Sequence, residues 1–325
     1  MIEIDGSTGE SGGQILRTAL TLASITKKPF RICNIRAKRP KPGLQPQHLM
    51  ACRAIRNVCR GTLIGAETGS STLEFAPGEI VGGRYDFDIG TAGSVTLVAQ
   101  TIIPVLLHAG KKSEVRINGG THIIKSPGYD YFAEVFLPAI RTMGANVESR
   151  IIKPGYYPVG GGEIALTISP SRVVGIKEWK KPYNGEESEI RAIIRLSNLP
   201  TSIAVREKKV LVQNEITDIR VIEESAACPG NAVTLWSNFK GAYVPGEKGK
   251  RAEAVAQETI DALKMEHGEV DRHLADQLLL YCGLASGESR FECSEFTEHF
   301  KTNSYIISKF LDKKIVTDGN KATVL

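Results

Sequence analysis

The sequence predicts an α+β fold: three βαβαββ units around a pseudo-threefold axis, with a small α/β domain inserted before the last unit. Three observations lead to this prediction. The chain has 325 residues, and single cores stop growing near ~250–300 residues. A pattern of strands, helices and glycine turns recurs with an offset of roughly 80 positions, which is too long for a solenoid repeat. Residues 184–269 interrupt this pattern.

The first unit begins at the N-terminus. Its helices are recognised by apolar residues at helical spacing, such as Leu49, Ile55 and Val58. In chain order we expect a strand at 2–5, a glycine-rich turn at 6–13, a helix at 14–25, a strand at 30–35, a helix at 47–59 and strands at 62–64 and 72–75.

The second and third units repeat the same order of elements, and helices are expected to cover one face of each sheet. For the second unit we expect a strand at 86–89, a glycine turn at 90–93, a helix at 94–107, a strand at 115–117, a loop at 119–128, a helix at 131–143 and strands at 147–152 and 163–168. For the third we expect helices at 276–284 and 303–311, a loop at 294–302 and strands at 290–293, 315–317 and 322–325.

The interrupting segment has its own strands and helices. Strands are expected at 190–196 and 233–236, and helices at 205–214 and 252–265. A lysine-rich stretch with a proline, residues 177–184, would be the linker into it. The sequence therefore predicts a large domain of three repeats, residues 1–183 and 270–325, and a small inserted domain, residues 184–269.

Composition excludes several classes of protein. Hydrophobic residues make up 42% and charged residues 24% of the chain, which excludes disordered, collagen-like and coiled-coil proteins. No apolar run reaches the ~18 residues of a membrane helix, and the N-terminus lacks the pattern of a secretory signal. We therefore expect a cytoplasmic protein without a membrane partner. Six cysteines without CxxC spacing favour buried structural thiols over a zinc site.

Basic residues are clustered although the net charge is only +5. Residues 27–41 contain seven Lys or Arg side chains and no acid. Such a cluster favours a polyanionic partner, and a merely solvated face is an equally good interpretation of charge alone.

The repeat brings equivalent loops together. The two glycine turns each precede a helix, and helix N-termini expose N–H groups to anions. Neither turn has the spacing of a known nucleotide-binding loop, so the glycines alone favour simple turns. A phosphate cleft between the units remains a plausible alternative.

Polar side chains near these loops are candidates for that cleft. Arg36 and Arg39 follow a strand, where arginine can bind phosphate in a bidentate manner, although a basic surface loop is also consistent. Arg17 lies in an apolar helix and needs a partner, for which Glu10 is nearest. Asp276 could be a helix cap.

His299 lies in the expected loop of the third unit. A histidine facing a phosphate cleft can act as a nucleophile toward phosphorus or as a general base. It can equally be a structural loop residue, and the residues alone leave these alternatives open.

Several longer motifs occur in one order along nearly the whole chain, and together they resemble the RNA 3′-terminal phosphate cyclase family. The matching stretches are DGSTGESGGQILR (5–17), IRAKRPKPGL (35–44), QPQHL (45–49), GTAGS (90–94), GYYPVGGG (155–162), HLADQ (273–277) and His299 with Thr302 and Asn303. The fold of that family, three such units with a small insert, agrees with the repeat pattern.

The resemblance implies an ATP-dependent chemistry. Such enzymes transfer AMP from ATP to a histidine, then to an RNA 3′-phosphate, and the neighbouring 2′-OH closes a 2′,3′-cyclic phosphate with release of AMP. It implies ATP and Mg or Mn as cofactors and RNA with a 3′-terminal phosphate as partner. A homodimer and the role of the insert stay open.

The resemblance also implies roles for individual residues. His299 would be the nucleophile, Arg17, Arg36 and Arg39 would hold phosphates, Glu10 would hold the metal, and Gln47 would position the phosphate or RNA end. The ATP pocket would be lined by Gln100, Pro127, Tyr131, His273, Leu274, Ala275, Asp276 and Gln277. The role of the insert motif ACPGN (227–231) is not implied, and Gly160–Gly162 are expected to permit close packing.

Three alternatives have different consequences. A non-catalytic cyclase-like protein of ribosomal RNA processing would lack the histidine and much of the arginine set, which this chain retains. An enolpyruvyl transferase has similar repeats and forms no nucleotidyl-enzyme. A simple RNA-binding module would bind RNA in a salt-sensitive manner without using ATP.

Overall fold

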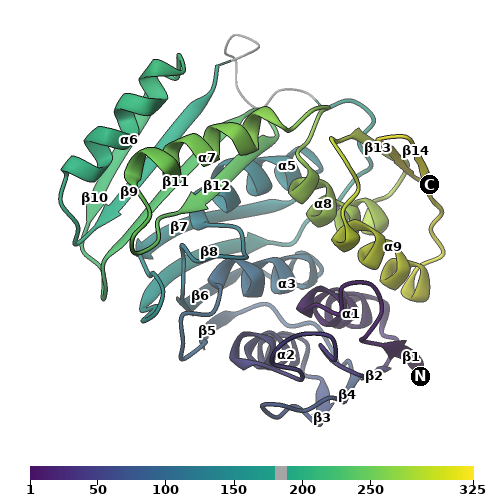
Figure 1. The fold of residues 1–325 in the computed structure, drawn as a ribbon. Helices are drawn as coiled ribbons and strands as arrows, with labels where there is room; N and C mark the ends of the chain where they lie inside the picture. The colour runs from purple at the N-terminus through teal and green to yellow at the C-terminus, as the bar shows by residue number, and fades with distance from the viewer. Residues whose placement is uncertain (180–188) are drawn as a thin grey trace.

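The computed structural model describes residues 1–179 and 189–325. It contains four small sheets with helices packed against them (Figure 1). The predicted mixed α+β class is therefore confirmed. Within the described residues, no helix combines the length and apolar character needed to cross a bilayer. All six cysteines are unpaired, and five of them are buried.

The first sheet has the strand order β1-β2-β4-β3, with β1 and β2 parallel and the other pairs antiparallel. Its apolar side chains, such as Ile4, Phe30 and Phe75, are buried beneath the helices. The elements are β1 (Ile2–Asp5), α1 (Gly13–Thr26), β2 (Phe30–Cys33), α2 (Pro46–Cys59), β3 (Thr62–Ile64) and β4 (Leu73–Ala76).

The second sheet has the corresponding order, β5-β6-β8-β7, with the corresponding parallel and antiparallel pairs. Strand β8 alternates buried and half-buried residues because only one of its faces is covered by helices. The elements are β5 (Arg84–Asp88), α3 (Val95–Leu107), β6 (Ser113–Gly119), α4 (Tyr129–Tyr131), the π-helix η1 (Phe132–Phe136), α5 (Leu137–Thr142), β7 (Asn146–Lys153) and β8 (Gly162–Ser169).

The third sheet has only three strands in the order β13-β15-β14. The leading strand of a βαβαββ unit is reduced to an isolated parallel bridge between Val174 and Ser286, so the predicted order of elements is incomplete here. The elements are α8 (Arg272–Leu284), β13 (Ser289–Glu292), α9 (Glu298–Phe310), β14 (Ile315–Asp318) and β15 (Lys321–Val324).

The inserted segment forms the fourth sheet, β10-β9-β11-β12, with a hydrophobic cluster of its own. Residues 180–188, which contain most of the predicted linker and the predicted domain boundary, lie outside the described residues. The elements are β9 (Arg191–Ser197), α6 (Ser202–Gln213), β10 (Asp218–Glu224), β11 (Gly230–Ser237), β12 (Lys240–Pro245) and α7 (Ala252–Lys264).

Helices α8 and α9 begin four and five residues earlier than the sequence analysis predicted, because their N-caps were missed. The side chain of Thr297 accepts hydrogen bonds from the N–H groups of His299 and Phe300, so α9 includes residues 298–302 of the segment expected as a loop. The carboxylate of Asp271 caps α8 in the same way. Asp276 therefore lies inside α8 and is not its cap.

Candidate active site

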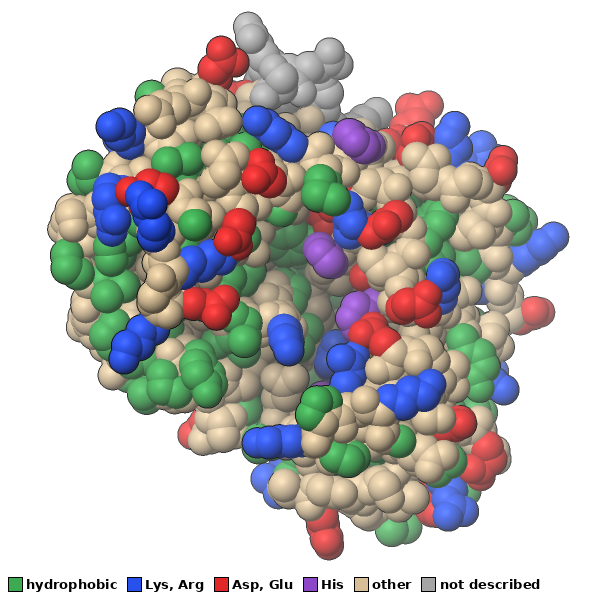
Figure 2. Space-filling model, viewed as in Figure 1, with side chains coloured by type: hydrophobic (Ala, Val, Ile, Leu, Met, Phe, Trp, Pro, Cys, Tyr) green, Lys and Arg blue, Asp and Glu red, His purple; other side chains and the backbone are tan. Residues whose placement is uncertain are grey.

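The two ends of the chain meet in one place. The glycine turn before α1, the loop after β2 and the first turn of α9 lie side by side and bring Glu10, Arg39 and His299 into contact. Figure 2 shows histidine, acidic and basic side chains on the wall of a hollow beside the lobe formed by β9–β12. This cluster is the centre of the candidate site.

Glu10 joins the other two side chains. Its Oε2 accepts a hydrogen bond from Arg39 Nη2 at 2.6 Å, and its Oε1 contacts His299 Nδ1. Apart from this contact with each other, neither Oε1 nor Nδ1 has a hydrogen-bond partner among the described residues. The predicted partner of Glu10 was Arg17, and the structure instead gives the direct contacts to Arg39 and His299.

Burial favours the neutral form of the histidine in this cluster. Burial lowers the pKa of His299 despite the opposing attraction of Glu10. Because Nδ1 faces the carboxylate and the imidazole is 42% exposed, Nε2 is the ring nitrogen left for chemistry. A neutral imidazole with an accessible nitrogen has the lone pair that a nucleophile needs.

Arg17 lies one turn into α1 and is partly buried. Its Nη2 donates to Gln14 Oε1 at 2.6 Å, and burial lowers its pKa to about 10, so it stays charged at neutral pH. The imidazole of His48 packs against Gly13, where an added Cβ would lie 2.2 Å from Nε2. Burial and the neighbouring arginines lower the pKa of His48 to about 3, which keeps it neutral beside Arg17.

Arg36 makes different contacts from Arg39 in this structure. Its backbone is left-handed (φ 55°), and its guanidinium donates to the carbonyl oxygens of Lys41 and Gly43 at the end of its own loop. Much of the basic run is similarly used within the fold, since Lys28 donates to Phe310 O and Arg31 pairs with Glu74. The run is therefore not one continuous basic patch.

Gln47 links the first unit to the glycine turn of the second. Its Oε1 accepts a hydrogen bond from the N–H of Ser94 at 3.2 Å. Gln47 also packs closely on Gly93, since a Cβ added at Gly93 would lie 3.0 Å from the Cβ of Gln47. Pro127 also lies at this helix start, where its carbonyl accepts from Thr96 at 2.7 Å. Both residues thus lie beside the N-terminus of α3.

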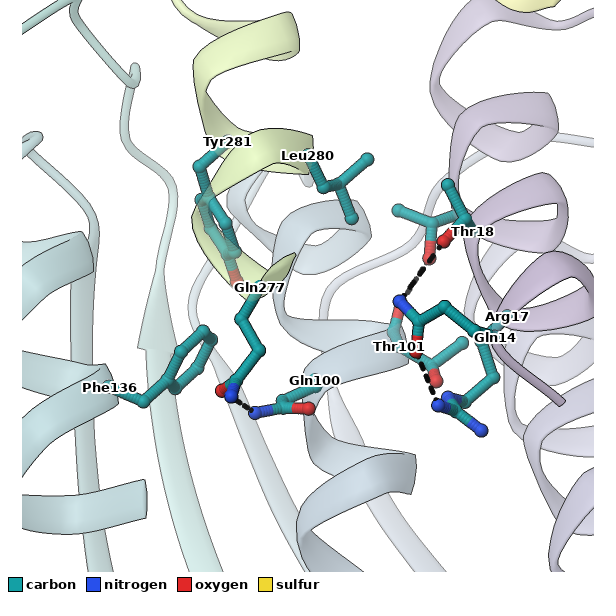
Figure 3. A pocket seen from close by; sticks show the side chains of 10 residues that line it. Gln14, Arg17, Thr18, Gln100, Thr101, Phe136, Gln277, Leu280 and Tyr281 are labelled. Carbon is teal, nitrogen blue, oxygen red and sulfur yellow. Dashed lines mark hydrogen bonds between the residues drawn. The ribbon is translucent and has the colours of Figure 1, made fainter. Parts of the chain in front are cut away.

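A polar pocket lies between α1, α3 and α8 (Figure 3). Gln100 donates to Gln277 Oε1 at 2.5 Å across this pocket, and Arg17 lines its other side. The structure therefore brings together three predicted residues from three different helices. The buried hydroxyl of Tyr281 also lines the pocket and has no partner within the described part of the chain.

Asp276 connects α8 to α9. It accepts from the Thr297 hydroxyl at 2.7 Å, and Thr297 caps the helix that bears His299. Burial, together with the like charges of Asp271 and Glu10, raises the pKa of Asp276 well above its ordinary value. Asn303 adds a second connection, since it donates to Asp276 O and accepts from Thr18.

The remaining predicted ATP-site residues lie on or beside α8. His273 is exposed, whereas Leu274 and Ala275 are buried in the hydrophobic core. Tyr131 is also buried, and its hydroxyl donates to the Asp271 carboxylate at 2.8 Å. Burial raises the pKa of Asp271 to about 6.

Two glycine motifs are explained by packing. An added Cβ at Gly230, in the ACPGN motif, would lie 2.0 Å from the Tyr156 ring, and Cys228 Sγ donates to Tyr156 O at 3.4 Å. Gly161 lies against Ala227 in the same way, while Gly160 lies against the backbone at Ala92. The GYYPVGGG loop therefore packs directly onto the insert.

Sequence reasoning missed several residues of the site. Thr297 and Asp271 could have been recognised as caps, because a Thr or Asp precedes each helix. His48 was noted only within a motif, and its position against Gly13 depends on tertiary packing.

A model of the family described as RNA 3′-terminal phosphate cyclase matches residues 8–317. The chain belongs to this family. The resemblance inferred from the sequence is confirmed, and membership in this enzyme family also confirms the prediction that the chain is an enzyme.

Proteins named RNA 3′-terminal phosphate cyclase match the chain over at least 96% of their own lengths. The protein named RNA 3′-terminal phosphate cyclase from Archaeoglobus fulgidus is 42% identical, with 100% of both chains covered. The protein of that name from Sulfurisphaera tokodaii is 43% identical, and the match covers 99% of this chain and 97% of the relative. The one from Methanococcoides burtonii is 40% identical, with 97% of this chain and 96% of the relative covered. The solved structure of the enolpyruvyl transferase NikO from Streptomyces tendae matches with a TM-score of 0.41 and 9% sequence identity. The match covers 99% of this chain and 47% of NikO, and a likeness this weak carries no argument.

Proposed function

We propose that this cyclase-family chain converts an RNA 3′-terminal phosphate to a 2′,3′-cyclic phosphate at the expense of ATP, through AMP bound to His299. The observation that carries the proposal is the contact of His299 Nδ1 with Glu10, whose other oxygen is held by Arg39. The full-length similarity to proteins named RNA 3′-terminal phosphate cyclase supports the choice of substrate.

In the first step, Nε2 of His299 attacks the α-phosphorus of ATP. The N–P bond forms as the bond to the β-phosphate oxygen breaks, and pyrophosphate leaves. The lowered pKa of His299 favours this step because the imidazole is neutral near pH 7. Arg17 and Arg39 supply fixed positive charge for the phosphates, and Arg36 supports the loop that holds Arg39.

In the later steps, a 3′-phosphate oxygen of RNA attacks the phosphorus of the His299 adduct. The N–P bond breaks, the imidazole is released and a 3′-pp-5′A end forms. The neighbouring ribose 2′-OH then attacks the RNA phosphorus, loses its proton and displaces AMP, which closes the cyclic phosphate. Gln47, at the glycine turn before α3, is proposed to position the RNA end.

A divalent metal, Mg or Mn, fits the charge of the site. The described residues contain no cluster of three or more His, Cys, Asp or Glu side chains that could hold a metal alone. Apart from its contact with His299 Nδ1, the buried Oε1 of Glu10 has no hydrogen bond within the described residues, and hard cations favour carboxylate and phosphate oxygens together. When bound, the metal would offset phosphate charge as a Lewis acid.

The nucleotide pocket is proposed to lie along α8. Gln100, Gln277, His273 and Asp276 would contact the nucleotide, with Pro127 at the N-terminus of α3. Leu274 and Ala275 would contribute through the core packing that holds the helix.

We also propose the division into a large domain, 1–183 and 270–325, and an inserted domain, 184–269, with three related units around a pseudo-threefold axis. The shared strand order of the first two sheets and the meeting of α1, α3 and α8 around one pocket support this proposal.

Labelling with ATP tests the function. The protein is incubated with α-labelled ATP and Mg or Mn without RNA, then denatured, and bound label is measured for the wild type and for His299→Ala. Exposed His267 offers the matched control, His267→Ala. We expect acid-labile label on the wild type and the control, none on His299→Ala, and transfer to an added RNA 3′-phosphate.

Other outcomes separate the alternatives. Absence of label under both metals overturns the histidine mechanism. Salt-sensitive RNA binding without ATP use would then favour a binding module, and label that stays on His299→Ala would place the adduct elsewhere.

A further inference from the structure

Asp271 is a buried junction between three separate parts of the chain. It caps α8 by accepting from the N–H groups of His273 and Leu274 at 2.9 and 2.8 Å. Its two oxygens also accept from the Tyr131 hydroxyl, each at 2.8 Å, and Oδ2 accepts from the N–H of Gly241 at 3.0 Å. Tyr131 belongs to α4 and Gly241 to strand β12 of the insert.

The contact between the insert and this junction is close. A Cβ added at Gly241 would lie 2.7 Å from Val135 Cγ2 and 3.0 Å from the Tyr131 ring. The backbone of β12 therefore comes within hydrogen-bonding reach of Asp271 because residue 241 has no side chain. The N–H of Asp271 also donates to the carbonyl oxygen of Phe239, the residue before β12, at 3.3 Å, so the backbone and the carboxylate of Asp271 hold the start of this strand.

Helix α8 transmits the position of this junction to the candidate site. Its first turns bear His273, Asp276 and Gln277, and Asp276 accepts from Thr297, the cap of the helix that bears His299. A displacement of the first turn of α8 would thus move both the nucleotide pocket and the nucleophile.

We propose that Asp271 and Tyr131 are positioning residues, which make the geometry of the ATP pocket depend on the docked insert. This inference rests on the proposed function. The insert is thereby part of the nucleotide site and not a separate appendage. The family resemblance predicts that Tyr131 lines the ATP pocket, and we infer that it acts through Asp271, because its ring is buried and its hydroxyl is committed to the carboxylate.

Docking of the insert does not depend on this junction alone. Arg195, on β9, makes two hydrogen bonds of 2.7 and 2.9 Å to Asp130, and both side chains are buried. Loss of the Tyr131 hydroxyl is therefore expected to loosen α8 while the insert stays docked.

The test compares two Tyr→Phe variants of the full chain. Tyr131→Phe removes the hydroxyl at the junction. Tyr129→Phe is the matched control, since Tyr129 is also buried and its hydroxyl contacts Ser149 Oγ at 3.2 Å within the second sheet's unit. For each protein we would measure the KM for ATP and the single-turnover rate of nucleotidyl-enzyme formation at saturating ATP.

We expect Tyr131→Phe to raise the KM for ATP about tenfold, with a change of less than about threefold in the saturated rate. Tyr129→Phe should leave both unchanged. Asp271→Asn replaces one accepting oxygen by an NH₂ group that faces donors, so it should raise the KM for ATP more than Tyr131→Phe does. The variant that carries both substitutions should have no higher KM than Asp271→Asn alone.

Hydrogen exchange provides a readout independent of catalysis. Amides of residues 272–276 should exchange faster in Tyr131→Phe than in the wild type or Tyr129→Phe. If the wild type is labelled by ATP, three results would overturn this inference without affecting the proposed function. They are unchanged exchange and KM in Tyr131→Phe, an equal change of KM in Tyr129→Phe, and additive effects in the variant that combines Tyr131→Phe with Asp271→Asn. A wild type that neither binds ATP nor becomes labelled overturns the proposed function and this inference together.

Discussion

Glu10 and His299 are in direct contact although they lie near opposite ends of the chain. The carboxylate reaches His299 from the glycine turn before α1, and the imidazole projects from the first turn of α9. Thr302, on α9, packs closely against the glycine turn, since a Cβ added at Gly9 would lie 2.5 Å from Thr302 Oγ1. A turn and a helix end thus form one site because each packs closely on the other.

Replacing Glu10 by Gln should impair the use of metal. The variant keeps the shape of the side chain and removes the charge beside His299 and Arg39. We expect nucleotidyl transfer to fall by at least about 10²-fold, with a higher requirement for Mg or Mn. Glu298→Gln is the control, because Glu298 pairs with exposed Lys301. An unchanged metal titration in Glu10→Gln would refute its assignment as metal ligand.

Arg39→Lys and Arg36→Lys should have different effects. Within the described part of the chain, the Arg39 guanidinium makes one hydrogen bond, to Glu10, and the side chain is 36% exposed. Lysine at position 39 should therefore lower activity about tenfold or more and change stability by less than ~0.5 kcal/mol. Arg36 holds two loop carbonyls, so Arg36→Lys should also destabilise the fold by about 1 kcal/mol. Urea unfolding and labelling rates check both, and equal stability losses would contradict the distinction.

Gly230→Ala should destabilise the contact between the insert and the GYYPVGGG loop. The added methyl group would overlap the buried Tyr156 ring, and overpacking of this kind costs about 1–3 kcal/mol. Gly110→Ala meets no atom within 4 Å and is the matched control. Urea unfolding measures both variants, and a neutral Gly230→Ala would mean that the ring can move aside.

The stability of the insert should decrease as the pH rises through the range 4.5–7. Glu207 is buried, with Asn231 as hydrogen-bond donor, and burial raises its pKa from 4.5 to about 7. Within that window the folded state binds more protons than the unfolded state, so stability falls with rising pH. Glu207→Gln should remove this dependence and stabilise the protein by about 1–2 kcal/mol at pH 8.

Unfolding free energies at pH 5 and pH 8 check this prediction. Asp261→Gln is a suitable control, since Asp261 is an exposed acid on α7 of the same insert. The prediction is wrong if Glu207→Gln keeps the slope of the wild type.

Local patterns predicted most helices and strands because apolar spacing and glycine turns are encoded by neighbouring residues. The helix at 94–107 and the insert strand at 190–196 match α3 and β9 within one residue at each end. The missed starts of α8 and α9 have a local cause too, since capping depends on one side chain before each helix. His299 was therefore expected in a loop and lies in a helix.

The sequence by itself determined the α+β class, the family and the set of polar residues available for chemistry. Only the tertiary structure decided which of them meet: Glu10 with Arg39 and His299, Gln100 with Gln277, and Tyr131 with Asp271. These pairs join residues far apart in the chain, and their distances depend on how sheets and helices pack. Side-chain spacing along one segment contains no information on that packing. The sequence therefore indicated which residue types were available for chemistry, but not which of them lie in contact.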